Sequence, residues 1–270
     1  MKAQLVDAHC HFDFRVFDGQ RASILEGARA AGISTLVVPG VGPENWPRLR
    51  ALAEHYPAIR YAPGIHPWWV GRVGGDAIAA LEREITDRLP GMVAIGECGL
   101  DRLRNHQDKQ SEVFRVQIRL AQRHGYPLLI HSVRSHDEVG ALLKSEGFSN
   151  PFLLHGFSGS WEQAMGIVER GGYIGIGGII THTRAKKTRD AIRRLPDHAL
   201  IMETDAPDMP PTGLRKGENT PLNLPWFFDS LCRLRGADPE TLSARILSNT
   251  ERLFMQRLEP EGLHGGSAPV

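Results

Sequence analysis

The segment from Asp7 to His11 carries two imidazoles at a spacing that suits a bound cation. Side chains alternate along a strand, so His9 and His11 point the same way while Cys10 points away from them. Two imidazoles placed like this can chelate one metal ion. A pair of ordinary polar residues at a strand end would give the same pattern, so the pair alone leaves both interpretations open.

Further ligand-type residues stand after other apolar runs. Glu97 lies within Gly96–Gly99, where glycines let a backbone approach a ligand closely. His131 and His155 each follow three apolar residues, at the same relative position on successive predicted strands, and Asp205 also closes a segment that begins apolar. Taken singly, each has a simpler explanation: a salt bridge for Glu97, a hydrogen-bonded core histidine, or a helix cap for Asp205.

Taken together, these side chains supply four imidazoles and two carboxylates, enough for two cations that share a carboxylate. The predicted metal ligands are His9, His11, Glu97, His131, His155 and Asp205. Burying so many polar groups without a metal would leave a costly, poorly satisfied cluster. We therefore predict two divalent ions. Mixed imidazole and carboxylate ligands suit Zn²⁺, Mn²⁺, Fe²⁺ or Ni²⁺, whereas Mg²⁺ prefers oxygen, and the sequence does not choose among Zn²⁺, Mn²⁺ and Mg²⁺.

Short β-branched runs alternate with longer amphipathic stretches along the chain, and together they must position these residues. The predicted strands are Ala3–Asp7, Ile33–Val38, Arg60–Gly64, Met92–Ile95, Pro127–Ile130, Pro151–Leu154, Tyr173–Ile176 and Ala199–Met202. The predicted helices are Gln20–Ala31, Pro43–His55, Asp76–Arg88, Asp108–His124, Ser135–Glu146, Ser160–Arg170, Arg184–Leu195, Pro221–Arg235 and Pro239–Leu258.

This strict alternation predicts a parallel sheet in an α/β protein. The ligand-type residues, with His66, all fall just past the ends of predicted strands. An open sheet would spread those ends along a wide edge, whereas a barrel gathers them over one mouth. We predict a single (β/α)₈ TIM barrel over residues 1–258, with the metal site at the C-terminal mouth of its strands, and a flexible tail over residues 259–270.

Composition narrows the class of partner. Lys and Arg number 32 against 31 Asp and Glu, a net charge of +1, so any nucleic-acid contact must be local rather than a broad basic face. No apolar run approaches the roughly 18 residues of a membrane span. Three scattered cysteines and the lack of a secretory apolar segment at the start predict a cytoplasmic protein. Oligomeric state is not specified, and a monomer is compatible with the sequence.

From about residue 5 to about residue 255 the sequence resembles the TatD-type metal-dependent deoxyribonucleases, within the amidohydrolase-like barrels. The resemblance rests on the segments Asp7–Asp13, Gly64–Pro67, Gly96–Asp101, Ile130–Ser132, His155–Gly159 and Glu203–Pro207. It implies that His9, His11, Glu97 and Asp205 hold one metal and that Glu97, His131 and His155 hold the second. It also implies that His66 contacts a phosphate. Glu203 stands two residues before Asp205, on the same strand face, and would help to position Asp205 without binding a metal itself.

The resemblance further implies a two-metal-dependent hydrolase of phosphodiester bonds, a 3′-5′ exodeoxyribonuclease acting on single-stranded or frayed DNA ends through a metal-bound hydroxide. We expect Glu97, Asp205 and His66 to be the catalytic residues. Asp205 would accept the proton of the attacking water, and His66 with Arg134 would neutralise the phosphate oxygens. Two alternatives stay open: hydrolysis of a small-molecule amide, lactone or phosphoester, and a metal-stabilised binding protein without activity.

Several residues depart from the family pattern, all on loops expected at the barrel mouth. Arg102-Leu103-Arg104 and His182 stand where relatives commonly carry aromatic residues, and Trp68-Trp69 is unusual. The tryptophans could stack on an unpaired base or could simply pack the loop against the rim. The basic residues Arg102, Arg104, Arg134, Lys186, Lys187, Arg215 and Lys216 could line a path for a phosphate backbone, although a solvated helix face explains the lysines as well.

Overall fold

Eight parallel strands form two sheets that carry the ligand-type residues. We describe residues 3–255 and 258 of a computed structural model of the chain. In one sheet β1 (Leu5–Asp7), β2 (Ile33–Pro39) and β3 (Ile59–Ala62) pair in chain order. In the other sheet the order is β4 (Ile95–Asp101), β5 (Leu128–Val133), β6 (Phe152–Leu154), β7 (Gly172–Ile176) and β8 (Leu200–Met202). The predicted α/β fold with parallel strands is thereby confirmed.

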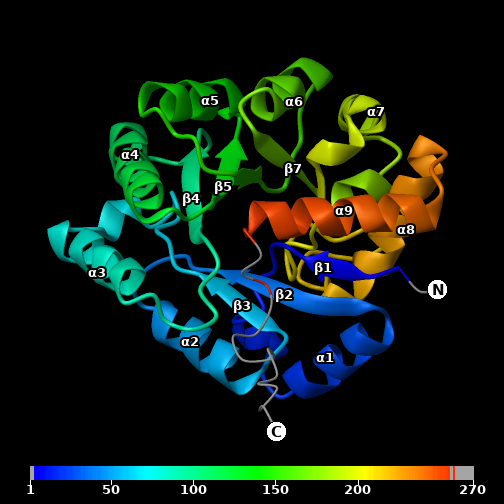
Figure 1. Cartoon of the computed structure of the whole chain (residues 1–270), viewed down its shortest axis with the longest axis horizontal. Helices are drawn as coiled ribbons and strands as arrows, with labels where there is room; N and C mark the ends of the chain where they lie inside the picture. Colours follow the sequence, from blue (N-terminus) through cyan, green and yellow to red (C-terminus); the bar gives the residue numbers. More distant parts are fainter. Residues whose placement is uncertain (1–2, 256–257, 259–270) are drawn as a thin grey trace, which may run out of the picture.

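Helices surround the strands as an outer ring (Figure 1). Within the described residues they are α1 (Arg21–Ala30), α2 (Trp46–His55), α3 (Gly75–Thr86), α4 (Gln107–His124), α5 (His136–Ser145), α6 (Trp161–Val168), α7 (Lys186–Arg194), α8 (Leu224–Arg235) and α9 (Pro239–Leu253). Short 3₁₀ turns lie at Arg15–Phe17, Val70–Arg72, Gly178–Thr181, Asp197–Ala199 and Pro221–Asn223. No helix in the described part of the chain is long and apolar enough to cross a membrane.

The two sheets approach each other at both of their edges. On one side the Tyr61 backbone exchanges hydrogen bonds with the segment before β4, accepting from Val93 at 3.0 Å and donating to Gly91 at 2.9 Å. On the other side the Ala8 backbone N–H donates to the Met202 carbonyl at 3.1 Å. The strand ends of both sheets therefore face a common space.

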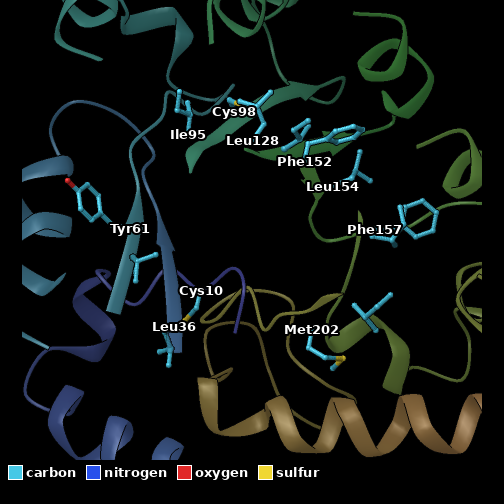
Figure 2. Packing of buried hydrophobic residues seen from close by; sticks show 14 of the residues in the cluster. Cys10, Leu36, Tyr61, Ile95, Cys98, Leu128, Phe152, Leu154, Phe157 and Met202 are labelled. Carbon is cyan, nitrogen blue, oxygen red and sulfur yellow. The ribbon is translucent and has the colours of Figure 1, made fainter. Parts of the chain in front are cut away.

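The apolar core fills the space between strands and helices and also the space among the strands. Figure 2 shows buried residues of the larger cluster, among them Leu36 on β2, Leu128 on β5 and Met202 on β8. A second cluster draws one or two small or branched side chains from successive strand regions: Ala8, Val37, Ala62, Val93, Ala94, Leu129, Leu153 and Ile201. These residues pack together beneath the polar strand ends, so the polar groups rest on an apolar floor.

The fourth strand differs from its prediction in a way that matters for the site. The sequence predicts a strand over Met92–Ile95 with Glu97 beyond it, whereas β4 runs over Ile95–Asp101 and Glu97 lies inside it. His131 likewise lies within β5 rather than past its end. Glycine and acidic residues are uncommon inside strands, which is why the pattern predicted a loop there.

A bulge explains how β4 tolerates these residues. Ile95 pairs with Leu128 and Cys98 with Ile130, so β4 spends one residue more than β5 over the same interval. Bulges re-aim a side chain next to a functional site. Gly99 follows at φ +134, and a Cβ there would collide with the His131 carbonyl, so the two strands can approach only because Gly99 has no side chain.

Near the C-terminus the structure describes residues up to 255 and residue 258. The last helix, predicted to reach Leu258, ends at Leu253. The predicted tail over residues 259–270 lies outside the described residues.

Replacing Gly64 by alanine should destabilise the fold. A Cβ at Gly64 would lie 2.5 Å from the Gly96 carbonyl carbon, at the place where the two sheets meet. Overpacking of this kind costs about 1–3 kcal/mol, which lowers the melting temperature by several degrees in a chain of this size. Gly74→Ala is the matched control because nothing lies within 4 Å of its Cβ position. Equal melting temperatures for the two variants would contradict the close approach.

Candidate metal centre

The predicted site residues come together at the carboxyl ends of six strands. His9 and His11 follow β1, His66 follows β3, Glu97 lies in β4, His131 lies in β5, His155 follows β6 and Asp205 follows β8. Only His131 among them is more than slightly exposed. All seven lie close together. Each of the five histidines has a nitrogen within 3.5 Å of an oxygen of Glu97 or Asp205, and His9 lies within this distance of both carboxylates.

One half of the cluster surrounds one oxygen of Glu97. His9 Nε2 lies 3.3 Å from Glu97 Oε2 and 3.4 Å from Asp205 Oδ1. His11 Nε2 lies 3.3 Å and 3.5 Å from the same two oxygens. Two ligands about 2.1 Å from one ion at a tetrahedral angle stand about 3.4 Å apart. The four atoms therefore have the spacing of ligands around one cation.

Hydrogen bonding does not account for this half of the cluster. Within the described residues His9 Nε2, Glu97 Oε2 and Asp205 Oδ1 are buried and have no hydrogen-bond partner, although they lie close together. Buried polar atoms without partners cost free energy. A divalent ion among them would satisfy all of these lone pairs at once, so the residues fit the metal that the sequence predicts.

The other half surrounds the second oxygen of Glu97. His131 Nδ1 and His155 Nε2 each lie 2.8 Å from Glu97 Oε1. The opposite nitrogen of His131, Nε2, stands 3.3 Å from Asp101 Oδ2. Each ring nitrogen of His131 therefore faces a carboxylate, and each donates to it when the ring is protonated: burial lowers the pKa of His131, but the hydrogen bonds to Asp101 and Glu97 outweigh it and raise the pKa to about 9. With a cation bound, the contact with Asp101 would keep the proton on Nε2 and leave the Nδ1 lone pair for the cation. His131 is thus oriented to hold a cation through Nδ1.

His66 belongs to the same half. Its Nδ1 accepts the Trp68 backbone N–H at 3.1 Å, which places the proton of the neutral ring on Nε2, 3.0 Å from Glu97 Oε1. Burial lowers the pKa of His66 to about 4, against the opposing pull of Glu97, so the ring is neutral at pH 7. His66 also lies close enough to Glu97 and His131 to form with them a set that could hold a metal ion, so its predicted role as a phosphate contact stays a prediction.

Two further acidic residues lie buried behind the candidate ligands. Burial raises the pKa of Asp7 to about 7, and its carboxylate accepts from the Thr204 backbone and hydroxyl at 2.8 Å and 2.6 Å. Burial raises the pKa of Glu203 to about 8, and Glu203 accepts the Gly156 N–H at 2.5 Å. Shifts of this kind, produced here mainly by burial, are common at functional sites.

The loop that carries Asp205 is held in a strained conformation. Asp205 has φ 53, in the left-handed region that non-glycine residues rarely adopt. Its N–H donates to the His9 carbonyl at 2.8 Å, and the Asp7–Thr204 bonds fix the preceding residue. No role for Asp7 or Asp101 was predicted from the sequence. Both belong to segments that carry the family resemblance. Asp7 stands two residues before His9 and Asp101 four residues after Glu97, and this spacing from a predicted ligand could have pointed to them.

Residues at the rim occupy varied surroundings. Arg134 lines a cavity of about 680 Å³ together with Lys187 and Thr188, at the amino ends of α5 and α7. Neither Arg134 nor Lys187 forms an ion pair within the described ranges, although Asp137 and Glu138 line the same cavity. His182 lies away from the cluster of candidate ligands. Its Nε2 donates to the Pro210 carbonyl at 3.0 Å, as expected for a residue at the rim.

A parallel α/β fold with histidines and carboxylates gathered at the carboxyl ends of its strands defines a metal-dependent hydrolase. The sequence profile described as TatD related DNase matches residues 6–255. The chain belongs to this family, and it is a hydrolase acting on ester bonds.

Individual relatives agree with this assignment. The chain is 38% identical to the uncharacterized metal-dependent hydrolase YjjV of Escherichia coli K12, covering 94% of this chain and 99% of the relative. The crystal structure of YjjV superposes with a TM-score of 0.91 over the same shares of the two chains. The 3′-5′ ssDNA/RNA exonuclease TatD of Citrobacter rodentium is 34% identical, with 86% and 90% of the chains covered. A TatD family hydrolase from Entamoeba histolytica shares the fold, with a TM-score of 0.81 at 19% identity over 94% and 98% of the chains.

Adding Zn²⁺ or Mn²⁺ to protein stripped by a chelator should raise its melting temperature. An ion present at 100 times its dissociation constant stabilises the folded state by about 2.7 kcal/mol. Glu97→Gln should lose most of this gain because the neutral amide cannot offset the charge of both halves, whereas Glu162→Gln, on the exposed start of α6, should keep it. The measurement is a thermal melt with parallel elemental analysis, and an unchanged gain in Glu97→Gln would contradict the assignment.

Proposed function

We propose that the protein is a two-metal-dependent 3′-5′ exodeoxyribonuclease acting on single-stranded or frayed DNA ends. The observation that carries the proposal is the division of Glu97: Oε2 faces His9, His11 and Asp205, while Oε1 faces His131 and His155. A carboxylate shared in this way is the arrangement expected between two cations. Relatives named as 3′-5′ ssDNA/RNA exonucleases, 31–34% identical, support the choice of substrate.

Within this proposal His9, His11, Glu97 and Asp205 hold the first cation, and Glu97, His131 and His155 hold the second. We further propose that the two sheets act as one closed eight-stranded barrel. The backbone hydrogen bonds at both of their edges and the shared apolar floor support it. A closed barrel would explain why ligands from β1 and β8 meet those from β4 and β5.

Different residues of the chain would carry out different parts of the reaction. When bound, the cations would lower the pKa of a water and polarise the scissile phosphate. Asp205 would hold the first cation through Oδ1, and its carboxylate would also accept that water's proton. His66 Nε2–H donates to a nonbridging phosphate oxygen. Arg134 and Lys187 at the cavity beyond β5 and β7 would attract the phosphates that follow along the strand.

A small phosphoester or amide remains the second candidate substrate. The observation in its favour is the charge balance of 32 basic against 31 acidic residues, which provides no broad attraction for a long polyanion. The assay described next separates the two candidates.

Single-stranded DNA labelled at its 5′ end and incubated with Mg²⁺ or Mn²⁺ should yield a ladder of shorter labelled products. Asp205→Asn should lower the rate of cleavage by about 100-fold or more, because this single substitution removes both the negative charge of a proposed metal ligand and the proposed proton acceptor. The measurement is a denaturing gel over time. Release of a labelled mononucleotide as the first product would reverse the proposed direction, and an intact strand alongside hydrolysis of a small phosphoester would favour the second candidate.

His66→Ala should separate phosphate recognition from metal binding. Removing one donor to the phosphate should lower kcat by about 100-fold. The melting-temperature gain from added metal should persist, because His66 is not among the proposed ligands. A variant that loses the metal gain together with the activity would make His66 a ligand and overturn the tautomer assignment.

A further inference from the structure

We propose that Trp68 and Arg104 form a stacking platform that binds a nucleobase next to the metal centre. The inference rests on the proposed nuclease function and names the part of the substrate that this rim recognises. Trp68 is 53% exposed at the edge of a site whose candidate ligands, apart from the partly exposed His131, are buried. Its ring centroid is 5.1 Å from that of His66 and 6.2 Å from that of His131.

Hydrogen bonds hold the Trp68 side chain in place despite its exposure. The indole N–H donates to Asp101 Oδ2 at 2.6 Å, and the same oxygen faces His131 Nε2 at 3.3 Å. The Trp68 backbone N–H donates to His66 Nδ1. An exposed aromatic ring would ordinarily lose rotamer entropy on binding a ligand, and a ring already fixed loses less. Trp68 is therefore preorganised beside the two histidines.

Arg104 completes the platform. Its guanidinium carbon lies 4.0 Å from the centroid of the Trp68 ring, a cation–π distance. Arg104 is exposed and forms no ion pair within the described residues, so its charge is not neutralised. Arg104 therefore covers part of one face of the indole, and the part of the ring that stays exposed, together with this cation, matches a base joined to a phosphate, the repeating unit of a single strand.

The neighbouring tryptophan serves a different purpose, which separates base stacking from rim packing. Trp69 is half-buried against the backbone at Gly42, where a Cβ would lie 3.4 Å from its ring, and Arg72 lies over its ring at 5.0 Å. Trp69 thus packs the loop onto the barrel rim, while Trp68 is turned toward the site. The base of the nucleotide at or next to the scissile phosphate is the ligand in reach of Trp68.

Two matched oligonucleotides test the platform: oligothymidylate, and the same oligomer with abasic residues at its two 3′-terminal positions. Binding is measured by fluorescence anisotropy with the full chain carrying Asp205→Asn, so that cleavage does not interfere. We expect this protein to bind the complete oligomer roughly 5- to 100-fold more tightly than the abasic one, the range of one stacked base. Adding Trp68→Ala should abolish the difference by weakening the complete oligomer only.

Further variants separate stacking from the contact with Asp101. Trp68→Phe keeps an aromatic face but removes the N–H, so it should retain most of the preference for the complete oligomer. Arg104→Gln should weaken binding of the complete oligomer. Trp226→Ala, an exposed tryptophan on α8 with 38% exposure, is the control and should leave both affinities unchanged.

The failure of this inference differs from the failure of the proposed function. An equal ratio of affinities with and without the Trp68 ring would overturn the platform, whether or not the wild-type protein cuts DNA. Absent cleavage with a preserved, Trp68-dependent preference would instead overturn the nuclease proposal and leave a nucleobase site. Weak binding of both oligomers, with no preference in the Asp205→Asn protein, would also refute the platform.

Discussion

The placement of one carboxylate, that of Glu97, is the constraint on which the rest of the site depends. Its two oxygens face two different sets of histidines, so one side chain sets the geometry of both. The bulge in β4 aims the side chain, and the backbone N–H of Glu97 donates to the Gly40 carbonyl at 2.8 Å. Gly64 and Gly99 permit the neighbouring strands to approach. The local irregularity of β4 is thus what joins the two halves.

The same cluster is a cost to the fold in the absence of cations. His9 Nε2, Glu97 Oε2 and Asp205 Oδ1 are buried without hydrogen-bond partners in the described chain, and Asp205 adopts a strained φ. Active sites commonly sacrifice stability in this way. The apolar floor of Val37, Leu129 and neighbouring side chains supplies the compensating burial. Because Glu97 and His131 lie within strands and the other candidate ligands lie within a few residues of strand ends, the strands packed on that floor set the geometry of the site.

Sequence reasoning predicted the order of elements and the residues that meet, and it did so for a physical reason. Parallel strands place their carboxyl ends on the same side of the fold. Polar residues that follow predicted strands, such as His9, His155 and Asp205, could therefore be predicted to lie together without coordinates. The bulge at Glu97 could not be predicted, because a glycine-rich acidic stretch has the composition of a loop. The tautomers of His66 and His131 were also out of reach, since each depends on a partner brought in by the fold.

The rim shows how chemistry and recognition are separated in this molecule. The tryptophan pair left two interpretations open in the sequence, because adjacent residues of one type carry no signal of which faces the ligand. The turn at His66 settles it: the Trp68 N–H bonds to the His66 ring, which directs the Trp68 side chain to Asp101, and Trp69 falls against Gly42. Trp68 thus orders His66 through its backbone and holds its own ring 5.1 Å from the ring of that histidine. Loops can vary such contacts while the strand-borne ligands stay fixed, which is how one hydrolytic centre can serve different substrates.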